Sequence, residues 1–254
     1  MSSVPPRSTL DGLQLLRVIA SSPGRTVHEA CDPASAQRLA VCRCPAPAAP
    51  PTPEAQARLR AAGMAAAVLE HPNLVAVRDC GWHGEAAYVT TAFVEGETTA
   101  AYLARVGRLP PLHGLALAVQ LLSALEFAHA HGLVHAAIHP EHLLVSRTGQ
   151  LKLTGFGWSA LAAGALRPGP FDDPRYLAPE QAAGQPCDSR CDLYAAAVVA
   201  FELITGVHPF ESDAFGRGEP AQRQEPRTVR TVRRGLPTAL DAVFRRALAP
   251  DPHD

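Results

Sequence analysis

The stretch HGLVHAAIHPEHLLV, residues 131–145, decides how the whole chain is interpreted. It follows a predicted helix at 115–131 that is closed by Gly132, and it leads to a predicted hairpin at 147–150. Five histidines lie at the helix end and in this loop: His129, His131, His135, His139 and His142. Histidine together with a carboxylate can bind metals. The loop is therefore either a site that performs chemistry or a loop that has only the framework of such a site.

The chain of 254 residues is 47% hydrophobic and 19% charged, as is typical of a globular protein with one two-lobed domain or two small ones. Its formal net charge of -1 argues against a surface for nucleic acid or for an anionic membrane. The basic residues are nearly all arginine, and Lys152 is the only lysine in the sequence.

The sequence predicts a cytoplasmic protein with reduced thiols and no membrane segment. Residues 1–12, MSSVPPRSTLDG, lack the apolar core of a signal peptide and are expected to be a flexible N-terminus. The apolar run 193–204 contains Glu202 and is shorter than the roughly 20 residues of a membrane span. The six cysteines lack paired CxxC spacing: Cys31, Cys42, Cys44, Cys80, Cys187 and Cys191.

The first ninety residues predict an antiparallel sheet with one helix. The predicted elements are strands at 13–19, 27–31, 38–44, 74–80 and 86–94 and a helix at 54–69. The segment PAPAAPPTP, 45–53, is expected to be a stiff Pro-rich connector, because proline lacks the amide donor. His83 and Gly84 mark a hairpin turn.

The rest of the chain is different in character. The helix at 115–131 is expected to be amphipathic, and an apolar helix from Leu193 onward dominates the C-terminal part. The two parts predict an α+β protein with a small antiparallel-sheet lobe containing one helix and a larger, mostly helical lobe.

The quoted stretch resembles the catalytic loop of bacterial serine/threonine protein kinases, HGIVHRDIKPENILL. Four more segments are similar to motifs of that family, in the same order and at matching spacing: HPNLVAV (71–77), KLTGFG (152–157), DPRYLAPEQ (173–181) and CDLYAAAVVAFELITGVHPF (191–210). The resemblance implies a two-lobed, ATP-binding protein-kinase-like fold. Its N-lobe is expected at 1–94 and its C-lobe at 95–254.

In this family, phosphoryl transfer depends on positioning and electrostatics, with a glycine-rich loop, a lysine held by a glutamate, metal ligands and a base. The three loop glycines correspond to Ala20, Ser22 and Arg25, whose side chains obstruct the close approach of phosphate to the backbone. The lysine position falls on Cys42, and the position of its helix partner falls on Ala62. The small lobe contains no lysine that could take its place.

The catalytic loop has lost its charged groups as well. Ala137 stands at the position of the base, and Ala136 at that of the arginine that receives a phosphorylated activation loop. His139 replaces the catalytic lysine, His142 the metal-binding asparagine and Gly155 the metal-holding aspartate. All of these catalytic and metal-binding groups are replaced, and the loss of a base alone lowers the rate by about 10²- to 10⁴-fold. The resemblance therefore implies no catalytic residues and no metal site.

The activation segment shows a parallel loss. Residues 157–178 contain Ser159 but no threonine, and Asp173 replaces the threonine of the family's GTPRY block. The phosphoacceptor and the arginine that would bind it are thus missing together.

These losses predict a pseudokinase, a regulatory scaffold that binds a protein partner of unknown identity and requires no cofactor. Metal-independent ATP binding remains an alternative, because Val27, Ala40, Thr91 and Leu144 stand where the family sandwiches adenine. If no nucleotide binds, these four residues are ordinary core side chains. The rival hypothesis is an atypical serine/threonine kinase that binds ATP and transfers phosphate with rewired residues, His139 or His142 serving as base or metal ligand.

Other family positions persist as fold anchors. His135 and Phe156 are expected to stack, and Asp192 is expected to bind the backbone of the catalytic loop. Glu180 pairs in the family with an arginine that lies beyond Asp254 here. A buried carboxylate without its partner costs about 3 to 5 kcal/mol, so either the sequence is truncated or the large lobe closes differently.

The cysteines and histidines also allow less specific interpretations. Two cysteine pairs each share a face of one element, Cys42 with Cys44 on a strand and Cys187 with Cys191 on a helix. We expect buried small hydrophobes, with a reactive thiol at Cys42 as the alternative. Three of the five loop histidines stand where the family commonly has histidine, so a metal site is the minor alternative there.

Overall fold

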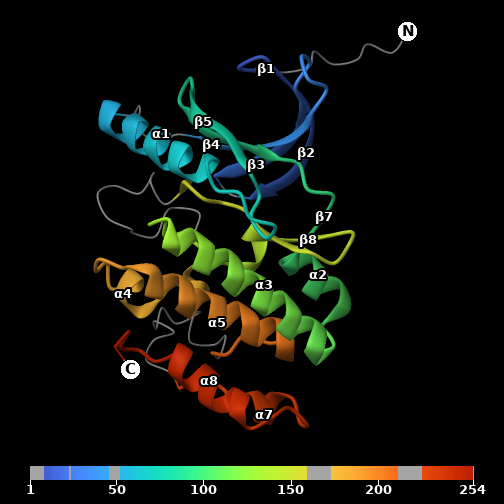
Figure 1. The fold of residues 1–254 in the computed structure, drawn as a ribbon, viewed down its shortest axis with the longest axis vertical. Helices are drawn as coiled ribbons and strands as arrows, with labels where there is room; N and C mark the ends of the chain where they lie inside the picture. The colour runs from blue at the N-terminus through green and yellow to red at the C-terminus, as the bar shows by residue number, and fades with distance from the viewer. Residues whose placement is uncertain (1–8, 23, 46–51, 159–172, 211–224, 254) are drawn as a thin grey trace. The chain divides into compact units, whose positions relative to one another are not determined.

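The computed structural model describes residues 9–22, 24–45, 52–158, 173–210 and 225–253. The chain divides into two compact units, a smaller one of residues 1–70 and 75–94 and a larger one of residues 71–74 and 95–254. The predicted fold class is confirmed: one unit is an antiparallel sheet with a helix, and the other is mostly helical (Figure 1). Residues 1–8, most of the Pro-rich connector and Ser159 lie outside the described residues.

The smaller unit is a sheet of strand order β1-β2-β3-β4-β6-β5, antiparallel throughout. Its elements are β1 (Thr9–Leu10), β2 (Leu13–Ser22), β3 (Arg25–Cys31), β4 (Arg38–Pro45), α1 (Pro53–Ala67), β5 (Val77–His83) and β6 (Ala86–Ala92). The predicted hairpin at His83 and Gly84 is confirmed by the pairing of His83 with Ala86. The predicted strand at 74–80 begins later, because Leu74 instead bridges to Leu153 in the larger unit.

The helix of the smaller unit packs closely on strand β5. Gly63 lies in the middle of α1, and a Cβ added there would meet the Sγ of Cys80 at 1.8 Å. The Cys80 thiol in turn donates a hydrogen bond to the carbonyl of Leu59 at 3.4 Å. A glycine that weakens the helix locally is therefore what allows this close contact.

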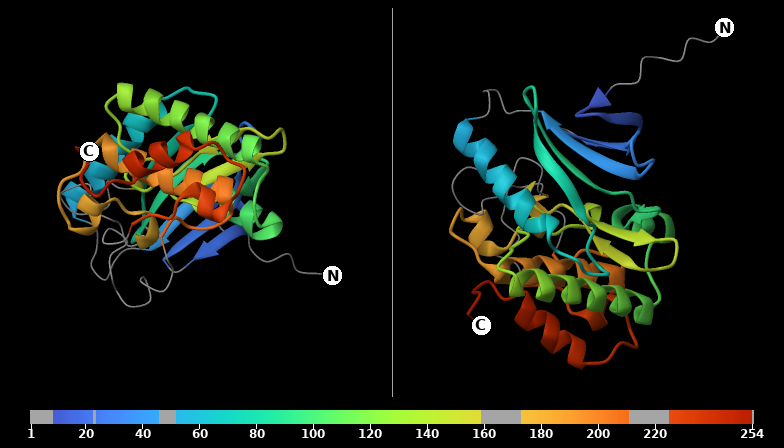
Figure 2. Two further views of the ribbon diagram at one scale, coloured as in Figure 1. Left: turned by 90° about the horizontal axis from the view of Figure 1, so that it is seen from below. Right: turned by 45° about the horizontal axis from the view of Figure 1, so that its top comes forward.

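The larger unit contains a three-stranded sheet, β7-β8-β9, and the helices around it (Figure 2). Its described strands and α-helices are β7 (Gly96–Thr98), α2 (Thr99–Val106), α3 (Pro111–Ala130), β8 (Leu143–Ser146), β9 (Leu151–Leu153), α4 (Pro179–Ala182), α5 (Ser189–Thr205), α7 (Val229–Val232) and α8 (Ala239–Ala247). Helices α3 and α5 lie side by side, and a Cβ added at Gly114 of α3 would meet the Leu203 carbonyl of α5 at 3.0 Å.

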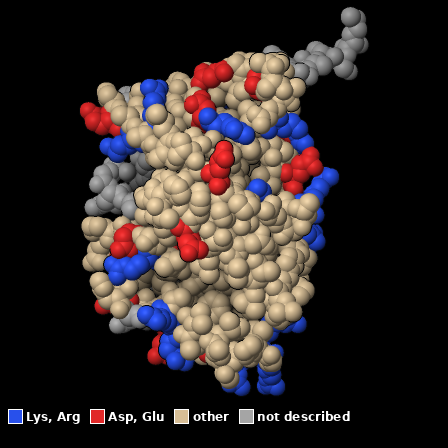
Figure 3. All heavy atoms as spheres, in the orientation of Figure 1, with Lys and Arg blue, Asp and Glu red and all other residues tan. Residues whose placement is uncertain are grey.

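Helix α3 is apolar on every side, so the expectation of an amphipathic helix is wrong. Leu117, Leu121 and Leu125 are fully buried, whereas Leu112 and Val119 are 81% and 65% exposed. Few charged side chains cover the face of the molecule where α3 lies (Figure 3). By length and composition this helix could also cross a membrane, but such a composition is equally that of a helix packed in a domain core.

Candidate functional site

The catalytic-loop segment leaves α3 and enters β8 through a short 3-10 helix, Pro140–His142. Asp192, in the first turn of α5, is fully buried and organises the start of this loop. Its carboxylate accepts hydrogen bonds from the backbone N–H of His135 at 2.8 Å and of Ala136 at 2.7 Å. It also contacts Nε2 of His129 at 2.8 Å. The predicted anchoring of the loop by Asp192 is confirmed.

Ala136 adopts a left-handed backbone conformation, with φ of 59°. This conformation is unfavourable for a residue with a Cβ, at about 1–2 kcal/mol. Asp192 accepts its N–H, and the side-chain amide of Gln181 donates to its carbonyl at 2.8 Å. Gln181 was not singled out from the sequence, although it ends the DPRYLAPEQ segment. The unusual turn is thus held from both sides.

His135 lies at the centre of the segment and is fully buried. Its Nε2 contacts the carbonyl of Thr154 at 2.9 Å, and its Nδ1 accepts the N–H of Ala137 at 3.2 Å. Burial lowers the pKa of His135 in spite of the nearby Asp192 carboxylate. The ring packs edge-on against Phe156, with centroids 4.7 Å apart and planes at 72°. The expected contact of these two rings is confirmed, as an edge-to-face pair.

The two histidines that replace the family's lysine and asparagine pack against each other. His139 and His142 are both buried, and their ring centroids lie 3.9 Å apart. Nδ1 of His139 accepts the N–H of Glu141 at 3.3 Å, whereas Nδ1 of His142 lies 2.7 Å from the carbonyl of Ala137. Because a carbonyl only accepts, Nδ1 of His142 carries the proton.

The His142 ring occupies the space beside Gly155. Gly155 has a φ of 100°, and a Cβ built on it would lie 3.1 Å from three atoms of the His142 imidazole. The sequence showed the replacements at 142 and 155 separately. The structure shows that they are neighbours and that the imidazole crowds the place where an aspartate side chain would begin.

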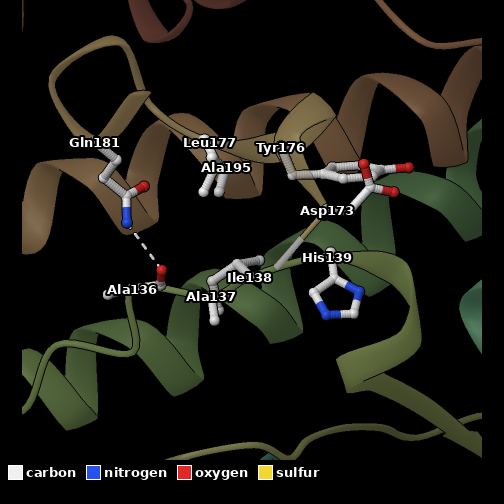
Figure 4. Close-up of a pocket in the computed structure, with 9 residues that line it drawn as sticks. All are labelled: Ala136, Ala137, Ile138, His139, Asp173, Tyr176, Leu177, Gln181 and Ala195. Atoms are coloured by element: carbon white, nitrogen blue, oxygen red, sulfur yellow. Dashed lines mark hydrogen bonds between the residues drawn. The ribbon is translucent and has the colours of Figure 1, made fainter. Parts of the chain in front are cut away.

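A hollow lies over Ala137, between the loop and the segment that begins at residue 173 (Figure 4). Ala136, Ala137, Ile138 and His139 form one wall, and Asp173, Tyr176, Leu177, Gln181 and Ala195 form the rest. Its interior volume is about 10 Å³, roughly the room that one water molecule needs. Small-molecule pockets measure roughly 300–1,000 Å³, so this hollow alone is too small for such a ligand.

Asp173 places a carboxylate at the rim of this hollow. Burial acts to raise its pKa, but hydrogen bonds from Arg175 outweigh burial, and the pKa lies below the usual range. The Arg175 guanidinium contacts the carboxylate at 2.6 Å. The charge of Asp173 is therefore paired with the arginine two residues away, so the carboxylate is held as an anion.

The retained residues around position 180 support the fold. Tyr176 is buried and donates its hydroxyl to Glu202 at 2.7 Å. Glu180 is only half-buried, so the expectation of a fully buried carboxylate is wrong. The guanidinium of Arg190 pairs with Asp188 at 2.9 Å, and the hydrogen bond to Asp188 raises the pKa of Arg190, with a smaller contribution from the charge of Glu180.

The positions that correspond to the family's glycine-rich loop, lysine and glutamate lie on strands β2, β3 and β4 and helix α1 of the smaller unit. Ala20 and Ser22 are exposed on β2, and Ser22 pairs with Arg25 of β3. Cys42 is half-buried on β4, where it pairs with Val27 and Val89. Ala62 is half-buried on α1. The described part of this unit contains no lysine, because Lys152 lies on β9 of the larger unit.

The four candidate adenine-contacting residues divide between the units. Val27 and Ala40 are half-buried on β3 and β4, and Thr91, buried on β6, pairs directly with Ala40. Leu144 belongs to the larger unit, where it is half-buried on β8 and pairs with Lys152. Within the smaller unit, three of the four thus lie on adjacent strands. Val27 and Ala40 are partly exposed and Thr91 is buried, and a nucleotide contact at these residues stays a proposal.

Metal binding finds little support in the donor atoms of the described residues. Among them, no group of three or more His, Cys, Asp or Glu side chains is placed to hold an ion. Magnesium prefers oxygen ligands, whereas the two family metal positions carry an imidazole and a glycine. These residues do not fit the magnesium site of a kinase.

Comparison with known proteins gives a consistent assignment. Residues 26–241 match the family described as protein kinase domain. Serine/threonine-protein kinase PknA of Mycobacterium tuberculosis is 36% identical over 81% of this chain and 49% of its own length. Probable serine/threonine-protein kinase PknB of Lactococcus lactis and PrkC of Bacillus subtilis are 33% and 31% identical, each over 77% of this chain. The chain spans about a third to a half of the length of these relatives.

Proposed function

The chain belongs to the protein kinase domain family, and on that premise we propose that it is a member that transfers no phosphate and acts as a protein-binding or regulatory domain. The proposal concerns chemistry, because a fold does not fix an activity. Its support comes from side chains at the positions where this family holds metal, phosphate and the substrate hydroxyl.

The observation that carries the proposal is the contact of His142 with Gly155. Kinases hold two magnesium ions with an asparagine and an aspartate at these positions. Here the first is an imidazole that lies 3.1 Å from where the second would place its Cβ. Neither position carries an oxygen ligand for a metal ion, and the imidazole crowds the space where an aspartate side chain would begin. The two replacements therefore change the chemistry of the site and not only its geometry.

The loop also lacks a group that could accept the proton of a substrate hydroxyl at the usual position. Ala137 presents a methyl group to the hollow, and the ring of His139 lies beside it (Figure 4). Nδ1 of His139 already accepts the N–H of Glu141, so the neutral ring carries its proton on Nε2 and would have to change tautomer to act there as a base.

Nucleotide binding without metal is compatible with this proposal. The half-buried Val27 and Ala40, together with Thr91, supply apolar surface and a small side chain on adjacent strands. A nucleotide held in this way would be a ligand and not a substrate. The partner is a protein in this proposal, in agreement with the near-neutral charge of the chain.

A second candidate is an atypical serine/threonine kinase with rewired residues. The relatives bear the names of serine/threonine kinases, which favours it. One structural observation does so as well: Nδ1 of His142 is protonated by its contact with the carbonyl of Ala137. The neutral ring therefore has its basic lone pair on Nε2, as a general base or a metal ligand requires.

Phosphate transfer from labelled ATP to a generic basic protein, with magnesium or manganese, separates the two candidates. We expect no incorporation into the chain or the substrate above a protein-free blank, while a serine/threonine kinase in the same buffer is the positive control. Transfer that disappears in the variant Ala40→Trp, with its melting temperature retained, would overturn the proposal. Loss of the same transfer in His142→Gln would then assign the base.

A thermal titration with ATP tests the nucleotide question separately. A rise in melting temperature that does not depend on divalent metal supports a nucleotide-binding domain, because a ligand of the native state stabilises it by mass action. No rise supports a scaffold without nucleotide. A rise that requires metal would favour the atypical kinase.

A further inference from the structure

We propose that the exposed face of helix α3 is a self-association surface, on which a second copy of this chain docks with its own α3 running antiparallel. The surface is called the α3 seam and consists of Leu112, Leu115, Val119, Leu122 and Glu126. The proposal goes beyond the proposed function and holds whether or not the domain transfers phosphate, because the seam contains no residue of the candidate site.

The seam follows the residue spacing of a coiled-coil helix. Its members recur at alternating intervals of three and four positions, which places them in one line along a helix. Leu112, Val119 and Leu122 are 81%, 65% and 47% exposed, and Leu115 is half-buried. The opposite face of α3 packs in the core of the larger unit. The helix thus has one covered apolar face and one apolar face that the described residues leave open.

The seam carries almost no charge. Glu126 is the only Asp, Glu, Lys or Arg residue in α3, and it is exposed. Few charged side chains lie around the helix on this face of the molecule (Figure 3). A row of exposed aliphatic side chains gains free energy when it is covered, and a neutral surface does not repel an identical one.

Helix α2 widens this apolar surface at the N-terminal end of α3. The rings of Tyr102 in α2 and His113 in α3 meet edge to face, with centroids 5.9 Å apart. Val106 lies one turn beyond Tyr102 and is 40% exposed. The charge of Arg105 in the same turn is paired with Glu97. A helix that docks on the seam therefore finds apolar surface beside it as well.

Charge decides the direction in which the two helices pair. In a parallel pair, Glu126 of each copy meets Glu126 of the other, and like charges in contact are unfavourable. In an antiparallel pair, Glu126 meets the N-terminal end of the other α3, where Arg108 lies exposed three residues ahead of the helix. The helix dipole is positive at this end. The antiparallel direction thus places opposite charges together at both ends of the seam.

One register brings the apolar and the charged residues of the two copies into opposite pairs: Leu112 with Leu122, Leu115 with Val119, and Arg108 with Glu126. It is the register in which the two-fold axis lies level with Leu117. Each pair is made twice, because a two-fold interface uses the same surface on both copies. From Leu112 to Glu126 the seam is about 21 Å long, at 1.5 Å per residue. An interface of this size is small, so we expect a dimer that dissociates on dilution.

Sedimentation velocity of the full chain over a wide range of concentration tests the surface. We expect a reversible equilibrium between monomer and dimer. Val119→Lys places a charge in the seam and should raise the dissociation constant more than about tenfold. Val243→Lys is the matched control, because Val243 is 58% exposed on α8 of the same unit and lies outside the seam. It should leave the dissociation constant unchanged, and melting curves check that both variants fold.

A charge swap tests the antiparallel register. Arg108→Glu alone and Glu126→Arg alone should each weaken the dimer about tenfold, because each places like charges opposite one another. The variant that carries both changes restores opposite charges and should recover the native dissociation constant. If the double variant is as weak as the single variants or weaker, the two residues do not meet and the antiparallel docking is wrong.

Other results would overturn the proposal by giving the seam a different role. A chain that stays monomeric at every concentration has no self-association surface. A monomer that floats with phosphatidylcholine vesicles, and loses this binding in Val119→Lys, would assign the seam to a lipid surface. A dimer that Val119→Lys does not weaken would be formed by another face of the molecule.

Discussion

At the scale of single residues, Asp192 explains how the loop keeps its shape without catalytic groups. It is fully buried and accepts two backbone N–H groups of the loop, one of them from the left-handed Ala136. Buried donors left without acceptors cost about 1–3 kcal/mol each. The retained residues are thus those that satisfy the backbone, and the lost ones are those that act on a phosphate.

Gly155 and His142 provide a residue-scale prediction. We expect Gly155→Ala to lower the free energy of unfolding by about 2–5 kcal/mol, because a left-handed residue with a Cβ costs about 1–2 kcal/mol and crowding adds about 1–3 kcal/mol. In a His142→Asn background the same change should cost about 1–2 kcal/mol less. Urea denaturation of the four proteins of this cycle measures the coupling.

Gly149→Ala is the matched control for that cycle. Gly149 also has a positive φ, 78°, but a Cβ there has open space around it. Gly149→Ala should lower the free energy of unfolding by only about 1–2 kcal/mol, the cost of a left-handed residue with a Cβ. This cost should be the same in the His142→Asn background. Equal costs for Gly155→Ala in both backgrounds would show that the imidazole does not restrict position 155.

At the scale of elements, one carboxylate ties three strands of the smaller unit together. Glu29 on β3 is 6% exposed and pairs with Arg17 of β2 and Arg38 of β4, each at 2.8 Å. The Arg38 guanidinium also lies 4.2 Å from the centre of the Phe93 ring. Burial acts to raise the pKa of Glu29, but the hydrogen bonds from Arg38 and Arg17 outweigh it, and the pKa is lowered.

The lowered pKa gives a pH-dependent prediction for this cluster. A carboxyl group whose pKa is lower in the folded state stabilises the fold above its unfolded pKa, roughly 4.3, and loses this contribution as the pH falls through the folded value. We expect Glu29→Gln to cost about 1 kcal/mol at pH 7 and progressively less below about pH 4. Chemical denaturation from pH 7 to pH 3 measures the difference.

Glu97→Gln is the control for a surface ion pair. Glu97 of β7 pairs with Arg105 in the last turn of α2, and both side chains are exposed. Its loss should change stability little at any pH, because exposed pairs contribute about 0–1 kcal/mol. A Glu29→Gln cost that stays constant from pH 7 to pH 3 would exclude a role for the ionised carboxylate.

At the scale of the whole molecule, the replaced catalytic positions are spread over both units. Cys42 and Ala62 belong to the smaller unit, whereas Ala137, His142 and Gly155 belong to the larger one. Elements that act together in catalysis contribute non-additively, so one restored group has little effect while the others are missing. This distribution predicts how reversion to the family residues should behave.

We expect no phosphate transfer from any single reversion among Cys42→Lys, Ala62→Glu, Ala137→Asp, His142→Asn and Gly155→Asp. Transfer above the blank should require the combination, and it should fall by about 10²- to 10⁴-fold when Ala137 is kept in that combination, as for the loss of a base. Labelled ATP with magnesium and a basic protein provides the assay. Activity from Ala137→Asp alone would show that the other positions are already competent.

Much of the architecture could be predicted from the sequence, because it depends on local signals. The strands around His83 and Gly84, helix α1 and the loop ahead of β8 are indicated by turn residues, proline and alternation, and five motifs in order gave the family. The amphipathic interpretation of α3 failed, because buried and exposed apolar residues look alike in a sequence. Only packing against α5 shows which face is covered.

The sequence by itself determined which chemical groups are missing, since a side chain that is not encoded cannot act. Only the tertiary structure decided how the remaining side chains use the vacated space: the His142 ring lies beside Gly155, and Asp192 lies under the loop. These contacts join residues that are separate in the sequence, and their geometry is set by packing and by hydrogen bonding of buried groups.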